Sequence, residues 1–315
     1  MNIKAIIISL SGLKLSPTET KLIINGRPWG IILFKRNISS LRQIKKLIDS
    51  IKKITKNQNF PILIDEEGGR VCRLSNFLDN SVYSQNFFSK IYVEKNILGK
   101  DLYINYISSM CSLFKTLGIN INTVPVLDLL QKKTHDIIGD RSYSYKVNIV
   151  KLMGNICVNT YKKNFIGTIM KHIPGHGAAT LDSHFKLPIV NKSLKKLMKE
   201  DFHCFKNIKP HFAMTAHILY SKLDSINPAT HSSFIIKNII RKKIGFKGMI
   251  ISDDISMKSL KFDLITNAKK SIDAGCNLVL YCAGKSNESR RLLKELPYID
   301  SFTKKKTSEF YKFLS

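Results

Sequence analysis

Three histidines and an aspartate fall within one short stretch, and their types suggest chemistry: His172, His176, Asp182 and His184. The His172–His176 spacing suits a metal ion when a helix places both rings on one face. Pro174 and two glycines interrupt any such helix, which disfavours a metal site. A metal-dependent hydrolase with these three histidines and Asp182 as ligands stays an alternative.

Asp182 and His184 stand two residues apart, a spacing that suits acid–base chemistry. A carboxylate this close can accept an imidazole N–H, fix the tautomer and raise the basicity of the ring. The histidine would then be an acid/base whose pKa lies near neutrality. Proline and glycine residues upstream indicate a shaped loop held close to a ligand. A purely structural role, with both side chains capping the loop, stays open for this pair alone.

Two further carboxylates, Asp253 and Asp254, follow the apolar run Met249–Ile251. Because side chains alternate along a strand, one aspartate can face a site while its neighbour faces away. A carboxylate near cations stays ionised and can act as a nucleophile. The same pair could equally coordinate Mg²⁺, so the motif alone leaves both functions open.

Eight short apolar runs predict the strands that position these residues. The runs are continuous rather than alternating, as expected of parallel strands buried on both faces. Helical periodicity separates most of them, as in Leu41–Lys53, Leu194–Lys206 with a Ser193 cap, and Ser233–Ile244 closed by Gly245. The predicted strands are Ala5–Leu10, Gly30–Phe34, Pro61–Ile64, Asn120–Leu127, Phe165–Met170, Phe212–Ala216, Met249–Ile251 and Asn277–Cys282.

This alternation favours a single (β/α)8 barrel, with a doubly wound open sheet as the alternative. No Gly-x-Gly-x-x-Gly follows the first run, so the usual motif of a nucleotide-binding open sheet is absent. No linker or repeat divides the chain, and we expect one domain over residues 1–315. The carboxyl ends of barrel strands converge on one rim, where active sites form. Titratable side chains end five successive runs and predict a site there: Asp65, Asp128, Lys171 with His172, His217, and Asp253 with Asp254.

The composition is strongly basic. The 315 residues carry a formal net charge of +28, with 51 Lys and Arg against 23 Asp and Glu. The lysines are spread along predicted helices without a nucleic-acid-binding module, so we expect a solvated surface, while an anionic substrate fits the charge equally well. Six single cysteines indicate reduced thiols in a cytoplasmic protein. No apolar stretch approaches the roughly 20 residues that span a bilayer.

Eight stretches carry a combined signature: Gly30–Asn37, Asp65–Leu74, Val124–Asp128, Arg141–Tyr143, Lys171–His184, Met214–His217, Asn227–Thr230 and Ser252–Met257. In consistent order over residues 5–285, they resemble glycoside hydrolase family 3, specifically its single-domain bacterial β-N-acetylhexosaminidases. The loop 171–184 paired with Ser-Asp-Asp-x-Ser-Met is the most specific part. Residues after about 285 match no motif.

The resemblance implies a role for each matching residue. Asp253 would be the nucleophile that forms a glycosyl-enzyme intermediate, and His184 would be the proton donor and acceptor, oriented by Asp182. Glu66 stands where many members have Gln, a change beside the binding aspartate. The positions that bind the N-acetylglucosamine unit would be Asp65, Arg73, Arg141, Lys171 and His172.

The resemblance also implies an activity. We expect a retaining exo-β-N-acetylhexosaminidase that removes terminal N-acetylglucosamine from muropeptides in cytoplasmic peptidoglycan recycling, without metal or organic cofactor. We expect a monomer that binds a small glycan and neither nucleic acid nor membrane. The alternatives are the metal-dependent hydrolase built on His172, His176 and His184, and a basic nucleic-acid-binding protein without turnover. Phosphorolysis in place of hydrolysis is a further alternative that the sequence does not exclude.

Overall fold

The computed structural model describes residues 2–132, 134–179, 181–183 and 186–315. Eight parallel strands close into a barrel, in the order β1-β10-β9-β7-β5-β4-β3-β2. Strand β1 closes it by pairing Ile7 with Leu280 on one side and with Gly30 on the other. The predicted (β/α)8 barrel is therefore confirmed. The strands are β1 (Lys4–Ser9), β2 (Pro28–Leu33), β3 (Ile62–Ile64), β4 (Ile121–Asn122), β5 (Gly167–Ile173), β7 (Phe212–Thr215), β9 (Met249–Asp254) and β10 (Leu278–Tyr281).

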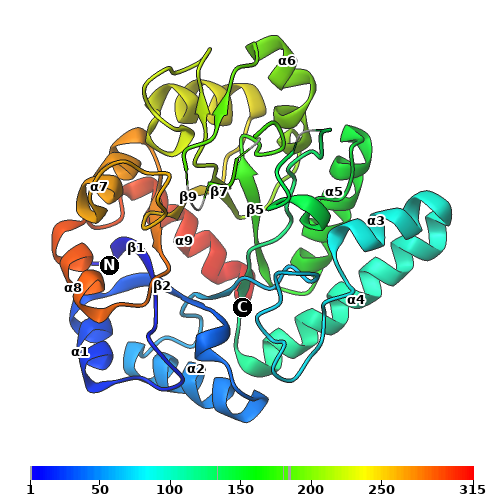
Figure 1. Ribbon diagram of the computed structural model, residues 1–315. Coiled ribbons are helices and arrows are strands. Elements are labelled where there is room, and N and C mark those ends of the chain that lie inside the picture. Colours follow the sequence, from blue (N-terminus) through cyan, green and yellow to red (C-terminus); the bar gives the residue numbers. More distant parts are fainter. Residues whose placement is uncertain (1, 133, 180, 184–185) are drawn as a thin grey trace.

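Helices surround the barrel, and α3 and α4 form a hairpin that projects from it (Figure 1). A wider helix, Ile235–Ile244, ends at Gly245 with φ 82°, as the predicted cap requires. No helix among the described residues is long and apolar enough to cross a membrane. The helices are α1 (Pro17–Gly26), α2 (Leu41–Thr55), α3 (Gln85–Glu94), α4 (Asn96–Leu117), α5 (Val147–Lys163), α6 (Leu194–Lys199), α7 (Leu264–Ala274), α8 (Ser286–Glu295) and α9 (Ser301–Leu314).

Alternate residues of each strand enter two different apolar layers. In β1, Ala5 and Ile7 belong to the cluster inside the barrel, whereas Ile6 and Ile8 join the cluster between strands and helices. Both faces of the strand are therefore buried, which explains why its sequence is a continuous apolar run.

Several predicted elements differ from those observed. The run Asn120–Leu127 forms only a two-residue strand and pairs with β5 again at an isolated bridge between Val126 and Lys171. Strand β5 continues through Lys171 and His172 instead of ending before them. The predicted helix Leu194–Lys206 is α6 followed by a tighter turn from Asp201 to Phe205. Two short strands, β6 (Ile189–Val190) and β8 (Leu219–Tyr220), pair in a separate sheet.

The C-terminal helix α9, for which the sequence suggested no role, packs at the opposite end of the barrel from the site. Trp29 Nε1 donates a 2.9 Å hydrogen bond to Thr307 Oγ1. Phe310 is 1% exposed and packs with Phe212 in the cluster inside the barrel. A Cβ on Gly167 would lie 2.7 Å from the Phe310 ring, so β5 needs glycine where the helix approaches. Helix α9 thus closes the amino-terminal end of the barrel.

Candidate active site

A cavity of about 410 Å³ opens where the carboxyl ends of the barrel strands meet. Six predicted site residues line it, and they come from four different strand ends or their following loops. They are Asp65, Arg73, Arg141, Lys171, His172 and Asp253.

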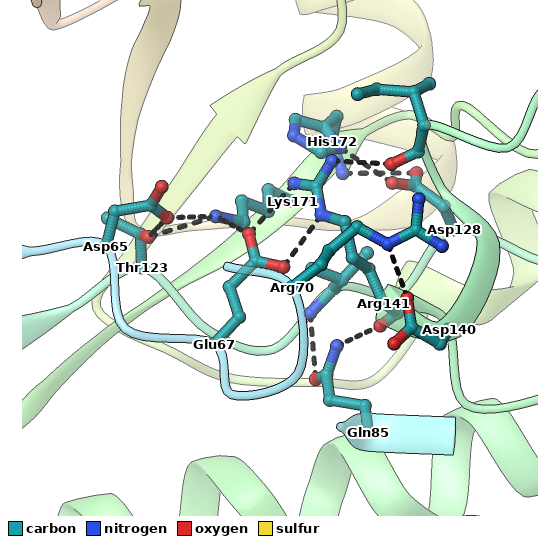
Figure 2. A network of polar contacts seen from close by, with 12 residues as sticks. Asp65, Glu67, Arg70, Gln85, Thr123, Asp128, Asp140, Arg141, Lys171 and His172 are labelled. Atoms are coloured by element: carbon teal, nitrogen blue, oxygen red, sulfur yellow. Dashed lines mark hydrogen bonds and ion pairs between the residues drawn. The ribbon is translucent and has the colours of Figure 1, made fainter. Parts of the chain in front are cut away.

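Asp65, directly after β3, is the centre of a charged group on the cavity wall (Figure 2). Its Oδ1 accepts a 2.6 Å hydrogen bond from the Lys171 ammonium and another from the Thr123 hydroxyl, while its Oδ2 pairs with Arg73. Burial by itself would raise the pKa of Asp65, but the two cations hold it well below its ordinary value. Asp65 is therefore an ionised acceptor.

Glu67 joins this group to Arg141. The Arg141 guanidinium donates from Nε and Nη2 to the two carboxylate oxygens, at 2.8 Å each, and Lys171 contacts the same carboxylate. Burial would raise the pKa of Glu67, but Arg141 and Lys171 lower it below the ordinary value. Three cations and two carboxylates thus alternate along the wall, which compensates charges that would be costly to bury alone.

Gln85, near the start of α3, supports Arg141 from outside the cavity (Figure 2). Its amide nitrogen donates to the Arg141 carbonyl, and its Oε1 accepts a 3.1 Å hydrogen bond from Val126 N. The projecting hairpin is therefore tied to the segment that follows β4.

Asp128 organises the histidines that end β5 and begin its loop. Its Oδ2 lies 2.7 Å from His172 Nδ1, and its Oδ1 accepts a 2.7 Å hydrogen bond from His176 N. Burial would raise the pKa of Asp128, but His172 lowers it. Burial lowers the pKa of His176 to about 4, so that ring is neutral near pH 7, and its Nε2 lies 3.2 Å from Ser183 Oγ. The start of the loop is thus attached to the strand end.

Asp253 and Asp254 both line the cavity at the end of β9. Asp254 N donates a 2.7 Å hydrogen bond to Asp253 Oδ1. The Asp254 carboxylate accepts hydrogen bonds from Ser256 N, Ser256 Oγ and Cys282 N. Burial raises the pKa of Asp254. The two aspartates therefore differ: Asp254 is bonded to the loops around it, and its backbone orients Asp253.

The loop after β5 holds the remaining predicted residues. Ser183 is buried and lines the cavity, and Asp182 is partly buried beside it. His184 lies outside the described residues. Among the residues that the structure does describe, no group of three or more histidine, cysteine or acidic side chains could hold a metal ion.

Several residues of the site were missed by sequence reasoning. Glu67 had only one signal, its place in an Asp-Glu-Glu triplet, and Thr123 had none. Asp128 was noted as a strand-ending aspartate but received no role. The contacts of these three residues depend on loops that follow different strands, so they emerge only once the barrel is closed.

Comparison with known proteins agrees with this geometry. Residues 3–305 match the glycosyl hydrolase family 3 N terminal domain. A Beta-hexosaminidase from Psychromonas ingrahamii is 31% identical over 291 residues, covering 90% of this chain and 84% of that protein. Among solved structures, NagZ from Neisseria gonorrhoeae in complex with N-trifluoroacetyl-D-glucosamine superposes with a TM-score of 0.87 at 26% identity, covering 100% of this chain and 90% of that one.

A second solved structure is longer than this chain. It is a glycoside hydrolase family 3 beta-N-acetylglucosaminidase from Paenibacillus sp., with a TM-score of 0.86 at 26% identity, and the match covers 98% of this chain and 60% of that one. The match to the family domain extends over nearly the whole barrel and includes every described residue of the cavity wall. This chain therefore belongs to glycoside hydrolase family 3 and is a glycoside hydrolase.

Proposed function

We propose that this chain is a retaining exo-β-N-acetylglucosaminidase that works through a covalent glycosyl-enzyme intermediate. The proposal rests on one observation: Asp253 lines the same cavity as the charged group formed by Asp65, Lys171 and Arg73. A carboxylate nucleophile and a set of sugar-binding charges need to share one pocket of this kind. The Neisseria relative that binds N-trifluoroacetyl-D-glucosamine supports the choice of sugar.

The charged wall is suited to a sugar with hydroxyl and acetamido groups. Ionised Asp65 accepts hydrogen bonds from hydroxyls, whereas Arg73, Arg141 and Lys171 donate to sugar oxygens, and His172 adds a ring held by Asp128. Because these groups already bind one another, they are oriented before the sugar arrives. Such preorganised polar groups contribute most when their bonds strengthen in the transition state.

In the first step, Asp253 attacks the anomeric carbon and forms a C–O bond while the glycosidic C–O bond breaks. His184 donates its proton to the departing oxygen and, held by Asp182, then takes a proton from water, which attacks the intermediate and releases Asp253. Two inversions retain the configuration. The buried, cavity-lining position of Ser183, next to His184 in sequence, supports this assignment. The mechanism requires no metal or organic cofactor.

The natural substrate we propose is an anionic muropeptide, cleaved in the cytoplasm during peptidoglycan recycling by a single-domain monomer over residues 1–315. The net charge of +28 supports an acidic substrate, because an excess of cations attracts it over long range.

The proposal is tested by comparing the 4-nitrophenyl β-glycosides of N-acetylglucosamine and glucose as substrates. We expect strong preference for the N-acetylated sugar and a β-configured first product by NMR. Asp253→Ala should abolish turnover, and His184→Ala should accumulate a glycosyl adduct detectable by mass spectrometry. Equal cleavage of both glycosides, an α-configured product, or full activity in Asp253→Ala would contradict the proposal.

Three further measurements separate the remaining alternatives. A hydrolase that needs no metal keeps its rate after chelator treatment, whereas a metal-dependent hydrolase loses it. A rate that rises strongly with added inorganic phosphate, with sugar 1-phosphate as product, would replace hydrolysis by phosphorolysis. Steeply salt-dependent duplex binding without turnover would instead favour a nucleic-acid-binding protein.

A further inference from the structure

His217 lies at the end of β7, beside the end of β9 that carries Asp253 and Asp254. The side chain is buried, 1% exposed, and its Nε2 lies 3.0 Å from the backbone carbonyl oxygen of Asp254. A carbonyl oxygen can only accept, so the proton of the ring must be on Nε2. This contact fixes the tautomer of the imidazole.

The other ring nitrogen of His217 has a partner that matches this tautomer. Nδ1 lies 2.7 Å from Thr230 Oγ1, which in turn lies 2.8 Å from Thr215 Oγ1, and both threonines are fully buried. Burial lowers the pKa of His217, which keeps the ring neutral and Nδ1 an acceptor. With the ring neutral, hydrogen bonds run from Thr215 to Thr230, to the ring and to the Asp254 carbonyl; Thr230 Oγ1 also lies 3.2 Å from the Ala216 carbonyl oxygen, a second acceptor for its proton.

This directed chain ends on the residue that orients Asp253. On one side of its Cα, the Asp254 carbonyl is held by His217; on the other side, the Asp254 N–H donates to Asp253 Oδ1 at 2.7 Å. The Asp254 carboxylate is held separately by Ser256 and Cys282. The Asp254 carbonyl oxygen also accepts a 3.1 Å hydrogen bond from Met257 N, so a change at His217 would remove one of its two hydrogen bonds while the side-chain contacts remain.

We propose that His217 is a positioning residue for Asp253, acting as a neutral hydrogen-bond donor to the Asp254 backbone. The inference rests on the proposed role of Asp253 as nucleophile. His217 does not act on the sugar in this role; it sets the direction from which the Asp253 carboxylate meets the anomeric carbon. Small errors in such an approach lower the rate of the chemical step more than they weaken binding.

Two amide substitutions isolate the donor. Glutamine places its side-chain nitrogen near the position of imidazole Nε2, whereas asparagine reaches only as far as Nδ1, so His217→Gln can donate to the Asp254 carbonyl and His217→Asn cannot. We expect His217→Asn to lower kcat roughly 10²-fold with KM within a few-fold of wild type. His217→Gln should recover most of that loss, and thermal unfolding should show both variants folded.

The threonine provides a matched pair that leaves the ring in place. Thr230→Val removes the hydroxyl that donates to Nδ1 and should lower kcat, whereas Thr230→Ser keeps the hydroxyl and should retain the wild-type kcat. This pair tests the inference even where a histidine variant fails to fold. Equal kcat values in Thr230→Val and Thr230→Ser, or in His217→Asn and wild type, would overturn it, as would equal losses in His217→Asn and His217→Gln.

Asp253→Asn, assayed in the same series, separates this inference from the proposed function. Full turnover in Asp253→Asn would overturn the nucleophile assignment, whatever the histidine variants do. If Asp253→Asn is inactive while His217→Asn keeps the wild-type kcat, only the positioning role of His217 fails.

Discussion

The Arg141 guanidinium faces the Glu67 carboxylate with two parallel hydrogen bonds of 2.8 Å, and the Glu67 side chain is only 1% exposed. Lys171 shares the same carboxylate. Planar pairs of this type are among the strongest and most directional in proteins. Glu67 thus neutralises two cations of the cavity wall and fixes the plane of one of them.

Glu67→Ala should therefore destabilise the fold, because it leaves Arg141 buried without the carboxylate that compensates it. We expect the free energy of unfolding to fall by about 3–5 kcal/mol, the usual cost of breaking a buried ion pair. Urea denaturation at pH 7 measures the loss. The matched control is Lys45→Ala in the exposed Lys45–Asp49 pair, for which we expect at most about 1 kcal/mol. Similar losses in both variants would contradict the role of Glu67.

Asp65 predicts how stability depends on acid. Its pKa lies well below the ordinary value in the folded state, because Lys171 and Arg73 outweigh the effect of burial. A carboxylate with a depressed pKa contributes stability above its unfolded pKa of about 4, and this contribution is lost as the pH falls toward the folded value. Asp65→Asn should thus be clearly less stable than wild type at pH 6, with the gap narrowing below pH 4.

Urea denaturation of both proteins from pH 7 down to pH 2.5 measures that gap. The quantity compared is the difference in the free energy of unfolding between wild type and Asp65→Asn at each pH. A gap that stays constant over the whole range would show that Asp65 titrates in the fold as it does in the unfolded chain.

Asp201 predicts the opposite dependence. Burial raises the pKa of Asp201 to about 7. Its Oδ2 accepts a 2.6 Å hydrogen bond from Gln131 Nε2, whereas its Oδ1 has no hydrogen-bond partner among the described residues. A carboxyl with a raised pKa stabilises the fold below its unfolded pKa, and the contribution is lost as the pH rises from about 4 to about 7.

Asp201→Asn keeps an acceptor for Gln131 and removes the buried charge. We expect the variant to gain stability relative to wild type as the pH rises from 4 to 7, and the gain to stay level above pH 8. Thermal unfolding at pH 5 and pH 8 measures the change, with exposed Asp101→Asn as the control. A gain that is equal at both pH values would contradict the raised pKa.

Sequence reasoning predicted the barrel because each strand is buried on both faces and therefore carries a continuous apolar run. It also placed Asp65, Lys171 and Asp253 at one rim, since parallel strands end together. It could not predict the Glu67–Arg141 pair, because two loops far apart in sequence must fold before these side chains meet. The short β4 strand was equally hidden, since Val124 and Val126 have strand-forming side chains although only Val126 pairs with β5, through an isolated bridge to Lys171.

Helix α9 was missed as a functional part of the fold, and it supports the last prediction. Phe310 fills the amino-terminal end of the barrel against Phe212, so Phe310→Ala should open a cavity and cost about 3–5 kcal/mol in the free energy of unfolding. The control on the same helix is Phe302→Ala. Phe302 is 39% exposed, and we expect its replacement to cost about 1 kcal/mol or less.

Since the cavity wall lies at the other end of the strands, kcat of folded Phe310→Ala should match wild type at low temperature. A single unfolding transition in both variants would support one cooperative domain, whereas a separate early transition in Phe310→Ala alone would show that α9 unfolds independently of the barrel.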